Sequence, residues 1–164
     1  MTERRTQWVT LSDKSPVGDI KEFVRANTRD GQEVHVGTDS LQHGRYTDFV
    51  TVVVILNPPK GGRVVSQRLI VPRMKSLRER LTREVWLSTE LSMTLDQPNL
   101  TIHIDANAKE KYPSSKYLQE LVGMVVGQGF KALWKPDSWA ATHVADHAVR
   151  YKHYPRVVQK RRLA

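Results

Sequence analysis

Three apolar runs lie close together in the first half of the chain. They are rich in Val and Ile and cover Glu33–Thr38, Phe49–Leu56 and Arg63–Val71. Runs of this kind are typical of β-strands. The segments between them are short and contain turn residues, such as Gly44 in the first and Pro58 in the second, so consecutive strands are expected to pair antiparallel. The pattern predicts a three-stranded meander.

After Pro72 the apolar spacing becomes helical. One face of the first predicted helix, Lys75–Leu95, carries Leu77, Leu81, Glu84, Ser88 and Leu91. The rest of the chain predicts a strand over Asn99–Asp105, followed by a helix that is capped by Ser114 or Ser115 and closes at Gly127. A fifth strand is expected over Phe130–Lys135. A final helix, capped by Asp137 or Ser138, is expected to continue through Val149. The helical crossovers make the fourth and fifth strands parallel partners of an earlier one. We therefore expect an α/β protein with a mixed sheet and helices on both faces.

The 164 residues suggest one main domain with an extension at each end. Residues 1–32 predict a helical extension whose helix is entered at Ser15 with Pro16 in its first position. Residues 33–149 form the predicted domain, and residues 150–164 form a basic tail.

This succession of elements resembles the ribonuclease H-like fold, which implies a five-stranded sheet in the order 3-2-1-4-5. The first and fourth strands are parallel neighbours in such a sheet. Asp39 follows the first of these strands and Asp105 the fourth, so both acids are expected at the carboxyl edge, where open α/β sheets bind their ligands. Two carboxylates that close repel each other unless a cation or a proton lies between them. A divalent metal ion is the occupant we expect.

Two further elements offer candidate ligands. His143 and Asp146 are spaced i, i+3 on the last helix, among small residues that allow close packing on the sheet. Glu84 falls on the apolar stripe of the first long helix, where a carboxylate needs a partner. Either metal coordination or an ion pair with an arginine would satisfy it.

Four segments, VHVGTDS, TIHIDAN, SSKYLQELVGMVVGQGF and KPDSWAATHVADH, resemble the uncharacterised YkuK-like family of the ribonuclease H-like superfamily. The resemblance implies phosphodiester cleavage with two Mg²⁺ or Mn²⁺ ions held by Asp39, Asp105 and Asp146. His143 before Asp146 resembles the paired ligands of the resolvase-type, RuvC-like branch, and is either a metal ligand or a group that moves a proton. In the ribonuclease H branch proper the second acid comes from the helix after the third strand, which Glu84 can supply.

Composition points to a polyanionic partner. The chain carries a net charge of +9 and no cysteine, which excludes disulfide scaffolds, thiolate zinc sites and cysteine nucleophiles. Six of the 26 basic residues lie in the tail, which has no acid, so residues 1–149 have a net charge of only +3. The residues expected to hold a phosphate backbone belong to the basic start of the long helix and to the tail: Arg73, Lys75, Arg78, Arg80, Arg83, Lys160, Arg161 and Arg162.

These observations together predict a metal-dependent nuclease acting on DNA, RNA or a hybrid. The main alternative is a nucleic-acid-binding or assembly protein that keeps the fold without catalysis. A zinc hydrolase with His143 and His147 as ligands is disfavoured, because the helix lacks the Glu that such enzymes use as a base. A phosphotransferase is disfavoured because the sequence has no Gly-rich phosphate loop.

The most apolar stretch, near Val50–Leu56, is too short to span a bilayer, and the first residues lack a signal-peptide pattern. We therefore expect a cytoplasmic protein with no membrane contact. A homodimer is compatible with the sequence, and junction resolution would require one.

Overall fold

The computed structural model describes residues 2–57 and 61–145. The elements in chain order are β1 (Arg4–Arg5), β2 (Val9–Thr10), α1 (Ile20–Asn27), β3 (Val34–His43), β4 (Tyr46–Leu56), β5 (Gly62–Pro72), α2 (Leu77–Leu95), β6 (Leu100–Asn107), the 3₁₀ helix η1 (Pro113–Tyr117), α3 (Leu118–Val126), β7 (Lys131–Lys135) and the π-helical segment η2 (Ala140–Ala145). None of the helices within these residues is long and apolar enough to cross a membrane.

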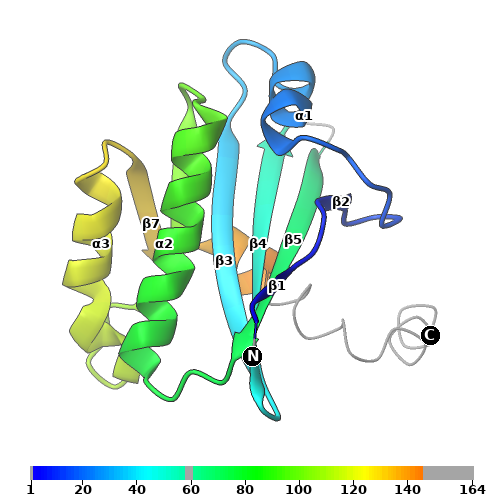
Figure 1. Ribbon diagram of the computed structural model, residues 1–164. Coiled ribbons are helices and arrows are strands. Elements are labelled where there is room, and N and C mark those ends of the chain that lie inside the picture. The colour runs from blue at the N-terminus through cyan, green and yellow to red at the C-terminus, as the bar shows by residue number, and fades with distance from the viewer. Residues whose placement is uncertain (1, 58–60, 146–164) are drawn as a thin grey trace, which may run out of the picture.

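The five long strands have the expected order, β5-β4-β3-β6-β7 (Figure 1). Strands β3, β4 and β5 form the antiparallel meander, while β6 runs parallel to β3 and β7 runs parallel to β6. The structure adds two short strands that the sequence pattern did not predict, because β1 and β2 both pair antiparallel with β5. The fold is therefore the predicted mixed α/β sheet, with its β5 edge extended by N-terminal residues.

Alternation along the strands divides the core between the two sheet faces. On one face, Val36 and Ile102 belong to the cluster that also contains buried residues of α1, α2 and α3. On the other face, Val52 and Val54 of β4 pack with Ala140 of η2. Figure 1 shows η2, in orange, behind the sheet on the side away from α2. Helical segments therefore cover both faces, as the sequence predicted.

The predicted start of the N-terminal helix, at Ser15, is wrong. Helix α1 begins at Ile20, and its N-cap is Asp19, whose carboxylate accepts a hydrogen bond from the Glu22 N–H at 2.9 Å. Pro16 instead lies in a β-bridge with Val9. Gly18 explains the difference because its φ of 73° is incompatible with a helix running through from Ser15.

The predicted caps of the second long helix are also wrong. Residues Pro113–Tyr117 form η1, and α3 begins after it at Leu118 without a side-chain cap. The Ser114 hydroxyl is used differently, since it accepts a hydrogen bond from the Asn107 N–H at 3.0 Å and thereby fixes the end of β6.

Candidate metal site at the carboxyl edge of β3 and β6

Asp39 and Asp105 lie on the neighbouring strands β3 and β6, each just beyond the paired residues. The parallel pairing of β3 with β6 ends at Gly37 and His103, and each aspartate follows its paired residue by two positions on the same face. The sequence placed both acids after their strands, whereas the structure places them within the strands. The reason is that β3 continues to His43 along β4 and β6 continues to Asn107. The expected parallel pairing of β3 with β6 is therefore confirmed, and the assignment of the two acids to a metal stays a prediction.

Glu84 reaches the same edge from α2. The Ser40 hydroxyl donates a hydrogen bond of 2.5 Å to Glu84 Oε1. One turn further along α2, Ser88 and Thr38 share a hydroxyl hydrogen bond of 2.7 Å. Two strand residues advance about 6.6 Å and four helix residues about 6 Å, so the two contacts hold α2 against β3 in a fixed register.

The Glu84 carboxyl is buried, with 6% of the residue exposed. The pKa of Glu84 is raised to about 8, chiefly by burial and also by the negative charge of Asp105, against the lowering effects of the Ser40 hydrogen bond and of the positive charges of Arg80 and Lys135. The sequence left metal coordination and an arginine ion pair open for this residue. The hydrogen-bond partner that the structure gives it is the Ser40 hydroxyl.

Lys135 is a member of this edge that the sequence analysis missed. It ends β7, and its ammonium lies 2.7 Å from Asp105 Oδ1. The β6–β7 pairing is irregular between Ile104 and Asn107, so Asp105 lies where the two strands change register. The expectation that three parallel strands end at one edge would have identified Lys135, since it is the last residue of the third strand.

The two candidate residues on the last helix differ in what the structure describes. His143 is exposed on η2, a segment that packs on β3, β4 and β6. Asp146 lies outside the described residues, as do Lys160, Arg161 and Arg162 and the part of the predicted last helix beyond Ala145.

A buried histidine pair lies on the same sheet face, toward the amino end of the strands. His35 Nδ1 and His103 Nε2 are 2.8 Å apart, and both rings pack on Trp139. His103 Nδ1 accepts a hydrogen bond from the Ala140 N–H at 3.2 Å, so this imidazole anchors the start of η2 to β6. Burial and the neighbouring His35 lower the pKa of His103 to about 3, which keeps it neutral.

The candidate phosphate-binding residues near α2 differ in whether their side chains already have partners within the protein. Arg78 pairs with Glu120 at 2.8 Å, and Arg83 pairs with Glu3 at 3.0 Å. Arg73 donates to the Gly44 carbonyl at 3.0 Å, at the tip of the β3–β4 hairpin. Arg80 is half-buried and close enough to Glu84 to affect its pKa. Lys75 is exposed just before α2.

The donor chemistry of the edge fits a divalent ion. Asp39, Glu84 and Asp105 offer carboxylate oxygens, the ligands that Mg²⁺ and Mn²⁺ prefer. Among residues 2–57 and 61–145, no three His, Asp or Glu side chains are close enough together to hold an ion. The carboxylate Asp105, which the sequence assigned to the metal, is paired there with the Lys135 ammonium.

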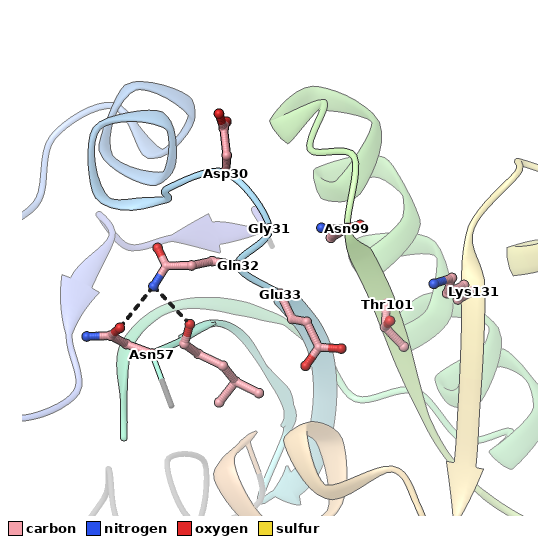
Figure 2. A pocket seen from close by; sticks show the side chains of 9 residues that line it. Asp30, Gly31, Gln32, Glu33, Asn57, Asn99, Thr101 and Lys131 are labelled. Atoms are coloured by element: carbon pink, nitrogen blue, oxygen red, sulfur yellow. Dashed lines mark hydrogen bonds between the residues drawn. The ribbon is translucent and has the colours of Figure 1, made fainter. Parts of the chain in front are cut away.

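A polar pocket lies at the opposite, amino end of the parallel strands. Figure 2 shows this pocket, of about 500 Å³, where β3, β6 and β7 begin. Its lining includes Asp30, Glu33, Thr101 and Lys131. Because β3, β6 and β7 are parallel, this pocket and the acids Asp39 and Asp105 lie at opposite ends of the same strands.

The chain is similar to several known proteins. The chain is 27% identical over 145 residues to the uncharacterized protein YkuK of Bacillus subtilis (strain 168), a match that covers 77% of this chain and 84% of that protein. Among solved structures, it resembles RNase H1 from Halobacterium salinarum NRC-1, with 13% identity, a TM-score of 0.43 and coverage of 72% and 98% of the two chains. It also resembles the N-terminal RNase H domain of a Mycobacterium tuberculosis protein, with 13% identity, a TM-score of 0.41 and coverage of 73% and 95%. The family model described as Ribonuclease H-like matches residues 16–150. Because that match spans most of the sequence, the chain belongs to the Ribonuclease H-like family.

Proposed function

We propose that the chain is a divalent-metal-dependent nuclease that hydrolyses phosphodiester bonds at the carboxyl edge of β3 and β6. The observation that carries the proposal is the placement of Asp39 and Asp105 two residues beyond the last paired residues of the parallel strands β3 and β6, with Glu84 of α2 hydrogen-bonded to Ser40 beside Asp39. Carboxylates gathered on neighbouring elements favour a bound cation, and in the metal-free protein the Lys135 ammonium lies on one of them, Asp105. Family membership supports the same chemistry.

The residues that would hold the metal are Asp39, Asp105 and Asp146, with His143 and Glu84 as further candidates. The resemblance described above implies that these residues would hold two Mg²⁺ or Mn²⁺ ions. When bound, divalent ions at a phosphodiester lower the pKa of the attacking water and neutralise charge on the leaving oxygen.

The protein's own groups would orient this site. Ser40 holds the Glu84 carboxyl toward the edge, and the Ser88–Thr38 contact fixes α2 so that Glu84 stays in place. His143, which is exposed on η2, is assigned either as a metal ligand or as a group that moves a proton during water attack. The expected product carries a 5′ phosphate and a 3′ hydroxyl.

Substrate holding is assigned to the cations around the start of α2. Arg73 and Lys75 are exposed and precede the helix that carries Glu84. Contacts of Lys and Arg with phosphates position a nucleic acid without reading its sequence. We therefore expect binding to DNA, RNA or a hybrid with strong salt dependence.

The test is a cleavage panel of labelled single strands, duplexes, RNA–DNA hybrids and four-way junctions with Mg²⁺ or Mn²⁺. Asp39→Asn and Asp105→Asn should each lower the cleavage rate by at least about 100-fold, since loss even of outer metal-site groups costs about 10- to 100-fold. Asp30→Asn is the matched control, because Asp30 is an exposed acid at the opposite edge. Its cleavage rate should equal that of the wild type.

Two outcomes would contradict the nuclease assignment. Either no substrate is cut, or both aspartate variants cut as fast as the wild type. Salt-dependent binding of the panel without cleavage would instead support the alternative of a nucleic-acid-binding protein that keeps the fold. If four-way junctions are the substrate, sedimentation should also show a dimer, because two strands must be cut by two sites.

A further inference from the structure

The ion pair between Lys135 and Asp105 is the best-defined charge contact at the acidic edge. Its atoms are 2.7 Å apart, and only 34% of the lysine side chain and 17% of the aspartate side chain are exposed. Partial burial weakens screening by water, so such a pair is stronger than an ion pair on the open surface. The Lys135 ammonium is therefore a defined part of the edge in the metal-free protein.

Lys135 also acts on the rest of the acidic edge. Its positive charge lowers the pKa of Glu84, whereas Asp105 raises it. The lysine thus opposes the repulsion between Asp105 and Glu84, which a metal ion would also do. Among the described residues, Arg80 is the other cation with this effect on Glu84, and it belongs to the same helix as Glu84.

Lys135 and a metal ion compete for the same carboxylate. A Mg²⁺ ion binds a carboxylate oxygen at about 2.0–2.1 Å and keeps strict octahedral geometry, which conflicts with an ammonium on that oxygen. Two cations side by side also repel each other. The lysine stem has four flexible carbons and is one-third exposed, so the ammonium has room to leave Asp105.

We propose that Lys135 is the resident counter-ion of the metal site: its ammonium neutralises Asp105 in the metal-free protein and is displaced when a divalent ion binds there. This inference rests on the proposed function for the identity of the site and adds how metal binding is regulated. Once displaced, the ammonium would be available to a substrate phosphate that enters at this edge. Metal binding would thereby release a phosphate-binding cation.

The experiment is calorimetric titration of the full chain with Mn²⁺ at low salt. Lys135→Met removes the competitor and should bind Mn²⁺ at least about fivefold more tightly than the wild type. Lys135→Arg keeps the charge and should stay within about twofold of the wild type. Lys131→Met is the matched control, since Lys131 lies at the opposite end of the same strand, β7. It should leave the Mn²⁺ affinity unchanged.

Thermal unfolding gives a readout that does not depend on activity. In EDTA, Lys135→Met should melt below the wild type, because Asp105 and Glu84 lose their counter-ion. Mn²⁺ should then raise the melting temperature of Lys135→Met by more than it raises that of the wild type.

Asp105→Asn separates failure of this inference from failure of the proposed function. If Asp105→Asn loses Mn²⁺ binding while Lys135→Met binds Mn²⁺ no more tightly than the wild type, the metal site stands and the counter-ion role of Lys135 is wrong. If neither the wild type nor Lys135→Met binds Mn²⁺, or if Asp105→Asn binds it as tightly as both, the metal site itself is absent and both proposals fall.

Discussion

The Ser40 hydroxyl and the Glu84 carboxyl are joined by a hydrogen bond of 2.5 Å that links β3 to α2 next to Asp39. Ser40 belongs to the α2-facing side of β3, and its neighbour Asp39 belongs to the opposite side. One strand segment therefore supplies an acid on one face and the partner of a second acid on the other. This arrangement lets a helix and a strand deliver carboxylates to a common edge.

Removing the Ser40 hydroxyl should destabilise the fold. Ser40→Ala leaves the buried Glu84 carboxyl without this donor, and such a loss costs about 1–3 kcal/mol in the free energy of unfolding. Urea denaturation in EDTA measures the change. Ser40→Thr retains a hydroxyl and should recover most of the stability; equal stability of Ser40→Ala and the wild type would show that the hydrogen bond contributes nothing.

The buried His103 should make the fold sensitive to acid. Its pKa is lowered from 6.5 to about 3, chiefly by burial, so the unfolded chain takes up a proton on acidification that the folded chain does not. The free energy of unfolding should therefore decrease as the pH falls from about 6.5 toward 3, by at most about 1.4 kcal/mol per pH unit from this group. Above pH 6.5 the contribution of His103 is complete and constant.

Denaturation at a series of pH values measures this effect. His103→Gln should show a shallower decline than the wild type across the same range, because a neutral amide does not titrate. His43→Gln, which changes an exposed histidine, is the control and should retain the wild-type slope. Parallel declines in the wild type and His103→Gln would contradict the assignment.

Replacing two exposed cations at the edge should weaken nucleic-acid binding. Arg73→Ala combined with Lys75→Ala should reduce affinity at low salt and make the plot of log affinity against log salt shallower by about 0.9 for each lost duplex phosphate contact. Fluorescence anisotropy at several salt concentrations measures both quantities. The control is Arg63→Ala, which replaces an exposed arginine at the start of β5 and should leave the slope unchanged. An unchanged slope in the double variant would remove these cations from the binding surface.

The sequence predicted the parts of the fold that periodicity encodes. The meander, the parallel strands β6 and β7, and the buried stripe of α2 with Leu81, Glu84 and Ser88 are all confirmed. The two-residue strands β1 and β2 were missed because so short a segment carries no period, and pairing with β5 is what makes them strands. The start of α1 was misplaced because Pro16 outweighed Gly18 and Asp19 in the reading of the cap.

Only part of the candidate site could be predicted from the sequence. Asp39 and Asp105 follow from alternation and strand order, which are local patterns combined with one topology. Lys135, the Ser40–Glu84 contact and the His35–His103 pair depend on which residues meet across elements, and spacing along the chain carries no information about that. Lys135 in particular lies 30 residues after Asp105 with a helix between them.

The central claim is that a divalent ion binds at the carboxyl edge of β3 and β6. The most direct measurement is a crystal structure of the full chain soaked in Mn²⁺, with data collected where manganese scatters anomalously. Our account predicts an anomalous peak within coordination distance of Asp39 and Asp105, with the Lys135 ammonium moved away from Asp105. Absence of a peak at this edge in crystals soaked to saturation, or a peak confined to the pocket at the amino end of the strands, would contradict it.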